Sequence, residues 1–338
     1  MFHARLFSTD PKYRAQMFKP CPEDRPLTVQ FCANDPDILL AAAKMVENDC
    51  DAVDINLGCP QGIAKKGNYG SFLLCNKDLI VSMVRKLKAE LKVPVTCKIR
   101  CLPTESQTLD LALAIQEAGA ALLTVHGRCK EHNKHRVGSA NYDMIGKIKE
   151  ALSIPVICNG GIGNWQDVER ALELTGCDGV MSSEAILEYP ALYDPTRIYD
   201  MDELMLEYFD LYEQYPGEAD LKCLRSHMFK FLHSGLSKHT DIRDKLNKAK
   251  GFEPLKQVAI DMKERRQDET VEEKLGWYYR HWRSMGLEKE NTKTFSVEPW
   301  DEQCIKDPLL NKALQPPKNK RQKTSDSQTG QHPAEEQK

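Results

Sequence analysis

A short strand followed by an amphipathic helix recurs from Leu27 onward, and this repeat limits the fold more than any other feature. Each predicted strand is a short apolar or β-branched run, and each helix has apolar residues at helical spacing. The predicted strands are 27–31, 52–57, 94–99, 122–126, 155–159 and 179–182. The predicted helices between them are 35–48, 77–91, 106–118, 142–151 and 164–174. Strands that alternate with helices in this way indicate a parallel sheet covered by helices.

Polar residues stand at the carboxyl ends of successive predicted strands, and their placement separates two architectures. A doubly wound sheet uses mainly its switch point, whereas a (β/α)8 barrel gathers every strand end around one mouth. The polar strand-end residues are Gln30, Asn56, Cys59, Lys98, Arg100, His126, Arg128 and Asn159. Five polar strand ends in a row predict a TIM (β/α)8-type barrel.

The strand count falls two short of the eight that such a barrel needs. Residues 1–26 contain four prolines and no predicted strand. Phosphate sites in TIM barrels commonly follow strands seven and eight, and here Gly160-Gly161 and Ser182-Ser183-Glu184 follow the last two predicted strands. Both observations predict a barrel that lacks its first two βα units.

The period changes after Ile186, which predicts a second domain. We predict the barrel over 1–195, a small all-helical domain over 196–266, and an extension with a disordered tail over 267–338. The whole chain has a net charge of −3, but residues 221–266 carry twelve Lys and Arg against five acids, a local +7. The helical domain is therefore predicted to have a basic surface.

Three positions are candidates for chemistry from the residues alone. Cys59 leaves a strand between Gly58, which permits a tight turn, and Pro60, which fixes it, although a buried structural thiol is an alternative. Lys98 ends an apolar strand, where an unpaired ammonium is costly unless an anion or an electron-rich ring accompanies it. Gly160-Gly161 before a helix can cradle a phosphate, although ordinary glycine turns are the alternative.

Other classes are excluded or disfavoured by what the sequence lacks. No Cys-x-x-Cys pair occurs, so structural zinc is a poor interpretation, and we predict no metal site. No apolar run approaches the roughly 18 residues of a membrane span, and the first residues lack a signal-peptide core. We expect no membrane partner and a cytoplasmic, possibly also nuclear, location.

These motifs together resemble the flavin-dependent tRNA-dihydrouridine synthases, in particular the eukaryotic type that acts at D-loop positions 16 and 17. The resemblance runs from about Leu6 to Met262. It rests on seven matches in order, at 29–31, 56–60, 67–74, 96–100, 125–128, 159–162 and 179–184.

The resemblance implies an oxidoreductase that uses FMN, reloaded by NADPH, to reduce uridine to 5,6-dihydrouridine in tRNA. It implies a hydride from the flavin to C6 and a proton from Cys59, the catalytic acid, to C5 from the opposite face. It places two groups of further residues in the site. The FMN contacts would be Gln30, Lys98, His126, Asn159, Gly160, Gly161, Ser183 and Glu184; Asn56, Arg128 and Arg100 would face the substrate. It also implies that residues 221–266 bind the tRNA backbone.

Two alternatives stay open at this point. One is a catalytically inactive, N-terminally shortened form that only binds RNA. The other is a dihydropyrimidine dehydrogenase-like flavoenzyme, which uses a similar Asn-x-x-Cys-Pro loop on free pyrimidines. A free base needs no basic helical surface, so the +7 segment favours a tRNA substrate over the second alternative.

Overall fold

A seven-stranded parallel sheet is the centre of the first part of the chain. The computed structural model describes residues 1–132, 138–215 and 220–275. The strands follow one another in chain order across the sheet, and all six neighbouring pairs are parallel. They are β1 (Phe2–His3), β2 (Thr28–Cys32), β3 (Ala52–Leu57), β4 (Val95–Arg100), β5 (Leu122–His126), β6 (Val156–Asn159) and β7 (Gly179–Met181). This sequential parallel order is that of a TIM-type barrel, as predicted.

The predicted count of six strands is wrong, because the structure has seven in one sheet and the first lies before Leu27, where no strand was predicted. Phe2 and His3 form β1, which pairs in register with Phe31 and Cys32 of β2. The helices α1 (Ala4–Thr9) and α2 (Pro11–Met17) follow it. Phe2, Phe7 and Phe31 pack together, with distances of 5.2–6.0 Å between their ring centroids. A two-residue strand is too short for a periodicity signal, and it is held by these tertiary contacts.

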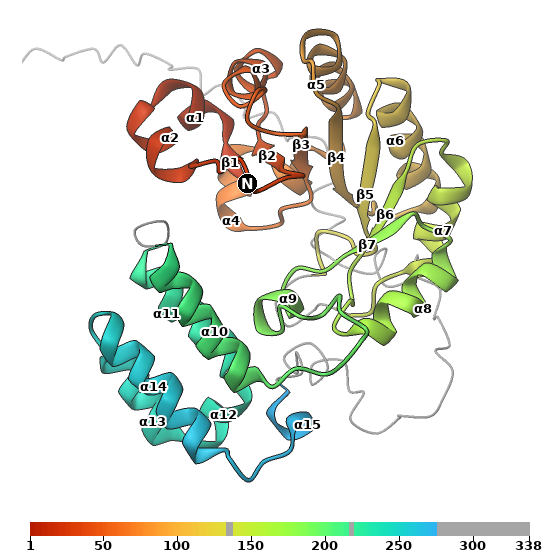
Figure 1. The fold of residues 1–338 in the computed structure, drawn as a ribbon. Coiled ribbons are helices and arrows are strands. Elements are labelled where there is room, and N and C mark those ends of the chain that lie inside the picture. Colours follow the sequence, from red (N-terminus) through yellow and green to blue (C-terminus); the bar gives the residue numbers. More distant parts are fainter. Residues whose placement is uncertain (133–137, 216–219, 276–338) are drawn as a thin grey trace, which may run out of the picture. The chain divides into compact units, whose positions relative to one another are not determined.

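Helices cover the outer side of the sheet in the order of the chain (Figure 1). Most of these helices have an N-cap residue whose side chain accepts a backbone N–H of the first turn. These N-cap residues include Asp35, Asn76, Thr104, Asn141 and Asn164. The barrel helices and one 3₁₀ turn are α3 (Pro36–Lys44), α4 (Gly62–Gly67), η1 (Gly70–Leu73), α5 (Lys77–Glu90), α6 (Glu105–Glu117), α7 (Tyr142–Ala151), α8 (Trp165–Thr175) and α9 (Ala185–Glu188).

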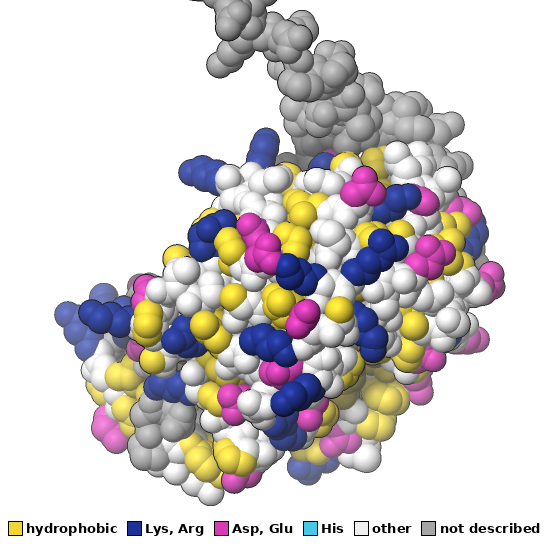
Figure 2. Space-filling model, turned by 90° about the horizontal axis from the view of Figure 1, so that it is seen from above, with side chains coloured by type: hydrophobic (Ala, Val, Ile, Leu, Met, Phe, Trp, Pro, Cys, Tyr) yellow, Lys and Arg dark blue, Asp and Glu magenta, His cyan; other side chains and the backbone are white. Residues whose placement is uncertain are grey.

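The outer surface of this helix layer carries charges of both signs. Lys77 pairs with Asp110 and Lys147 with Glu105, so neighbouring helices are linked by exposed ion pairs. Figure 2 shows Lys and Arg side chains interspersed with Asp and Glu on the face that it presents. This face therefore has no continuous field of one sign.

The strand register sets the levels of the barrel interior. Gln30 of β2, Asp54 of β3 and Thr96 of β4 are direct neighbours across the sheet. Two residues further along, Asn56 lies beside Lys98. Alternate residues of a strand face the same side, so Asp54 and Asn56 both point toward the interior, one above the other.

The second part of the chain is helical and has a core of its own. Figure 1 shows α10, α11, α13 and α14 lying side by side. Met201, Met205, Phe209, Leu224 and Met228 are fully buried in this core. The helices are α10 (Met201–Gln214), α11 (Leu221–Phe231), α12 (His233–Lys238), α13 (Thr240–Lys248), α14 (Phe252–Arg265) and α15 (Val271–Lys274).

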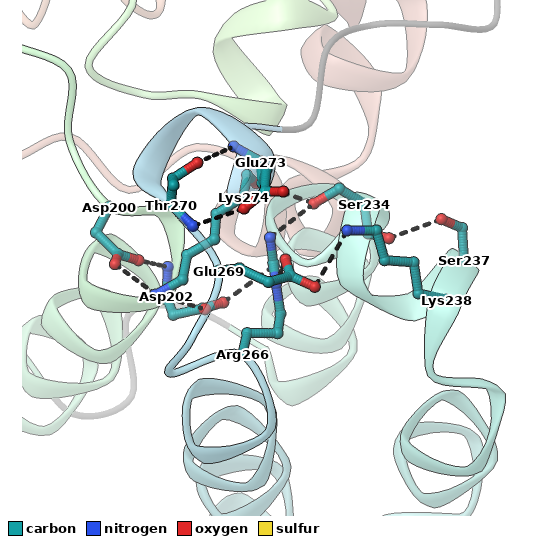
Figure 3. Close-up of polar contacts among 10 residues, drawn as sticks. All are labelled: Asp200, Asp202, Ser234, Ser237, Lys238, Arg266, Glu269, Thr270, Glu273 and Lys274. Atoms are coloured by element: carbon teal, nitrogen blue, oxygen red, sulfur yellow. Dashed lines mark hydrogen bonds and ion pairs between the residues drawn. The ribbon is translucent and has the colours of Figure 1, made fainter.

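A network of buried charges ties α15 to this helical region (Figure 3). Lys274 Nζ lies 2.7 Å from Asp200 Oδ2, and Arg266, fully buried, lies 3.3 Å from Asp202 Oδ1. Ser234 Oγ donates to the carbonyl of Lys274 at 2.9 Å. The helical region therefore continues at least to Leu275, beyond the boundary at 266 that the sequence predicted. The predicted tail beyond that point lies outside the described residues.

Within residues 1–132, 138–215 and 220–275, none of the helices is both long enough and apolar enough to span a membrane.

Candidate active site

Cys59 stands in a turn that is held on both sides. Asn56 Oδ1 accepts the N–H groups of Gly58 and Cys59 at 3.1 and 3.0 Å. On the other side, Ser71 donates both its N–H and its hydroxyl to the carbonyl of Cys59. The Cys59 side chain is partly exposed, unlike the fully buried Cys97 within β4. The turn thus presents a fixed thiol beyond the carboxyl end of β3.

Gly70 makes this close approach possible. Its φ is +63°, and a Cβ added there would lie 2.8 Å from the carbonyl oxygen of Cys59. Any other residue would push η1 away from the turn, so that Ser71 would lose the carbonyl.

Asn56 is linked through Gln30 to a buried carboxylate. Asn56 Nδ2 donates to Gln30 Oε1, and Gln30 Nε2 donates to Asp54 Oδ2, each at 2.8 Å. Thr96 Oγ1 donates to the other carboxylate oxygen of Asp54 at 2.6 Å. Burial raises the pKa of Asp54, and the hydrogen bonds from Thr96 and Gln30 oppose that shift.

Lys98 lies at the next level of the interior, beside β6. Its Nζ donates to Asn159 Oδ1 at 2.7 Å, and Asn159 Nδ2 donates to the carbonyl of Met181 in β7. Burial, helped by the positive charge of Arg100, lowers the pKa of Lys98 from its usual 10.5 to about 8. The carboxylate of Asp54 opposes this shift only in part, so the ammonium is incompletely compensated, which favours an anionic or electron-rich ligand.

Arg100 and Arg128 form a second pair of cations, and the His126 ring contacts Arg128. Arg100 Nε donates to the carbonyl of Gly58 at 2.9 Å, and its Nη1 donates to the carbonyls of Cys129 and His132. Arg100 therefore braces the turn, and the substrate contact predicted for it from the resemblance stays a prediction.

His126 and Arg128 are in direct contact, with Arg128 Nη1 3.2 Å from His126 Nε2. Burial and the charges of Arg100, Lys98 and Arg128 hold the pKa of His126 far below its usual range. Its ring is therefore neutral, with Nε2 as the acceptor. Burial lowers the pKa of Arg128 to about 10, which still leaves it charged at neutral pH.

The predicted phosphate loop lies next to this group. Gly160 has a φ of +111°, and a Cβ there would lie 2.8 Å from His126 Cδ2, so the loop can pass His126 only as glycine. Gly161 is exposed with a φ of +75°, and Ser183 and Glu184 are exposed after β7. Tyr142, which the sequence analysis missed, donates its hydroxyl to the carbonyl of Gly160 at 2.9 Å.

The structure brings the predicted residues into two neighbouring groups and adds others. Gln30, Asn56 and Cys59 form one hydrogen-bonded set, while Lys98, Asn159 and the arginines lie along β4 to β6. The residues that sequence reasoning missed are Asp54, Ser71, Gly70, Thr96 and Tyr142. Asp54 had a signal, because an acid two residues before Asn56 in an apolar strand shares its face. Among the described residues, no group of His, Cys, Asp and Glu could hold a metal ion.

Comparison with known proteins shows the family to which the chain belongs. The family model described as dihydrouridine synthase (Dus) matches residues 1–275. A Rattus norvegicus protein named tRNA-dihydrouridine(16/17) synthase [NAD(P)(+)]-like is 43% identical over 278 residues, covering 82% of this chain and 63% of the relative.

Two yeast proteins with the same name, without the ending "-like", are similarly close. The Schizosaccharomyces pombe protein is 45% identical over 75% of this chain and 66% of its own length. The Saccharomyces cerevisiae protein is 44% identical over 73% of this chain and 61% of its own length. The chain thus spans somewhat under two thirds of these relatives. Since the family model covers the barrel and the helical region alike, this chain belongs to the dihydrouridine synthase (Dus) family.

Proposed function

We propose that this protein reduces uridine to 5,6-dihydrouridine at D-loop positions 16 and 17 of tRNA, with FMN as its cofactor and NADPH as its reductant. Family membership and the names of the rat and yeast relatives support the reaction and the positions. The observation that carries the proposal is the Cys59 thiol, held by Asn56 and Ser71 beside buried cations.

The residues at the barrel mouth fit a flavin mononucleotide. Lys98, whose acceptor Asn159 is neutral, would face the electron-rich end of the ring, and Gly160-Gly161 would take the phosphate. Gln30 keeps one N–H and one lone pair for the ring edge. FMN, when bound, would supply the hydride that reduces the pyrimidine.

Cys59 would deliver the second hydrogen as a proton. A thiol is mostly protonated near neutral pH yet can give up its proton, so it suits a general acid. The hydrogen bonds from Ser71 and to Asn56 fix the backbone on both sides of the thiol. Asn56 keeps one N–H beyond its bond to Gln30, and Arg128 is held close by, so both could bind the base.

The tRNA would be held outside the barrel by its phosphates, with the target uridine turned out of its stack. In the helical region several basic residues are already neutralised, because Lys238 pairs with Glu269 and Lys245 with Asp261. The basic residues of 221–266 for which the described residues provide no acidic partner include Lys222, Lys230, Arg243, Lys248 and Lys250. We propose these as the phosphate contacts. A cytoplasmic or nuclear location is proposed only because tRNA is the substrate.

Replacement of Cys59 tests the proposal directly. We expect Cys59→Ala to slow dihydrouridine formation by about 10²–10⁴-fold, the usual contribution of a general acid, while bound flavin is unchanged. The measurement is dihydrouridine per tRNA after nuclease digestion, by mass spectrometry, with flavin absorbance on the same samples.

Cys75→Ala is the matched control, because Cys75 is an exposed thiol elsewhere in the barrel. It should behave as the parent protein. Equal product yields from Cys59→Ala and Cys75→Ala would refute the assignment. Reduction of free uracil but not of tRNA would favour the free-pyrimidine alternative.

A further inference from the structure

Asp54 is the buried end of a hydrogen-bond chain that reaches Cys59. It is 6% exposed and lies between its two register partners, Gln30 on β2 and Thr96 on β4. From Asp54 the chain passes through Gln30 to Asn56, and from Asn56 Oδ1 to the N–H groups of Gly58 and Cys59.

Asp54 alone determines which group donates and which accepts along this series of hydrogen bonds. Gln30 and Asn56 are amides, and an amide can turn by half a rotation to exchange its oxygen with its NH₂ group. Asp54 accepts at both of its oxygens, from Gln30 Nε2 and from Thr96 Oγ1, as an ionised carboxylate does. In this arrangement Gln30 offers its NH₂ to Asp54 and its oxygen to Asn56. Asn56 must then offer its NH₂ to Gln30, which leaves its oxygen for the turn.

The opposite order would break the turn. With Gln30 reversed, Asn56 would turn its oxygen toward Gln30 and its NH₂ toward two N–H groups. Both N–H groups would then lose their acceptor, which is unfavourable for a buried donor.

We propose that Asp54 is a positioning residue, which fixes the amide orientations of Gln30 and Asn56 and thereby holds the backbone of Cys59. This inference rests on the proposed function in so far as Cys59 is taken as the acid. The carboxylate itself has no contact with the Cys59 thiol and acts only through the two amides.

Hydrogen exchange at the Cys59 turn tests the proposal without using the reaction. In Asp54→Leu, Gln30 loses its acceptor and its amide can turn. We expect the amides of Gly58 and Cys59 to exchange about tenfold faster, measured by mass spectrometry of the peptide that contains them. Asp54→Asn keeps the size but offers either an oxygen or an NH₂ group, so a smaller increase is expected.

A double-mutant cycle shows whether Asp54 acts through Gln30. In Gln30→Met the link is already cut, so adding Asp54→Leu should change the exchange rates by less than about twofold. A structural role for Asp54 would give the same fold-change with and without Gln30. That result, or unchanged exchange in both Asp54 variants, would overturn the proposal.

The control is a second buried carboxylate far along the chain. Asp202→Asn removes a fully buried acid from the helical region and should leave exchange at Gly58 and Cys59 unchanged. The exchange results hold for any reaction at the site, so they fail or succeed separately from the Cys59→Ala assay. If both proposals hold, Asp54→Leu also lowers the single-turnover rate more than it raises the KM for tRNA.

Discussion

Two regions of the molecule bury cationic side chains, and they partner them in opposite ways. In the helical region, Arg266 and Lys274 contact the carboxylates of Asp202, Asp200 and Glu269. At the barrel mouth, the acceptors that the structure gives to the buried cations are neutral. Lys98 donates to an amide oxygen, Arg100 to backbone carbonyls, and Arg128 to a carbonyl and to the His126 ring.

The difference separates structural charges from functional ones. A buried cation beside carboxylates has its desolvation largely compensated within the protein. The cations at the barrel mouth hydrogen-bond neutral acceptors, and the carboxylates that act on them, such as Asp54 on Lys98 and Glu184 on Arg128, offset burial only in part. The pKa values of Lys98, Arg100 and Arg128 are therefore lowered. This incomplete compensation can be relieved by an anionic ligand, which supports the barrel mouth as the site for flavin and substrate.

The largest expected effect is on stability, at the compensated pair. Arg266→Met removes one partner of a fully buried ion pair and leaves Asp202 uncompensated, at a cost of about 3–5 kcal/mol in the free energy of unfolding. Denaturant unfolding measures it, and bound flavin per folded protein should not change. The exposed Arg265, paired with Asp241, provides the control, since Arg265→Met should alter stability little. Equal losses of stability in Arg266→Met and Arg265→Met would show that the buried ion pair at Arg266 has no special structural role.

The second largest effect is expected for FMN binding when Lys98 is replaced. Lys98→Met should weaken FMN binding by about 10–100-fold, the worth of a hydrogen bond to a charged group. Its free energy of unfolding without ligand should stay the same or rise, because a poorly compensated buried charge has been removed. Titration of FMN fluorescence and denaturant unfolding give the two values. A Lys98→Met protein that is less stable but binds FMN normally would make Lys98 a structural residue.

The pH dependence of FMN binding should follow the pKa of Lys98. A pKa of about 8 means that the ammonium is charged below pH 8 and neutral above it. FMN affinity should therefore fall as the pH rises through 8, by up to about tenfold between pH 7 and pH 9. The unliganded protein should become more stable over the same range, since the unfolded chain then binds more protons than the folded one. Lys98→Met should show neither trend, and equal pH profiles for the two proteins would contradict the assignment.

Features that depend on local sequence patterns could be predicted, whereas features that depend on tertiary contacts could not. The apolar periodicity of the strands and helices is local, so the ranges from 27 to 182 agree with the structure to within a few residues at each end. Residues at strand ends could be assigned to one site because parallel strands bring these ends together. β1 escaped prediction because two residues carry no period, and α15 because a buried lysine holds it rather than an apolar stripe.

Hydrogen-bond partners were beyond the reach of the sequence. Asp54 lies within reach of Gln30 and Thr96 only because of the register of β2, β3 and β4. Ser71 reaches Cys59 through the fold of a loop twelve residues later. The sequence gives the number of basic residues in 221–266, but which of them form ion pairs depends on tertiary contacts. This pairing decides the last prediction, on the salt dependence of tRNA binding.

Salt dependence of tRNA binding should distinguish paired from unpaired basic residues on one helix. In α13, Arg243 and Lys248 have no acidic partner among the described residues, whereas Lys245 Nζ lies 2.8 Å from Asp261 Oδ2. A cation that neutralises a phosphate releases counterions, so its loss reduces the log–log salt slope by about 0.7–0.9. Arg243→Gln and Lys248→Gln should each reduce the slope by about that amount, measured by filter binding across a salt series with bound flavin as a check on folding. Lys245→Gln should change it less, because its charge is already compensated by Asp261. The reverse order would mean that Lys245 leaves Asp261 for the tRNA, and that an exposed ion pair, unlike the buried pair at Arg266, does not withhold its cation from a ligand.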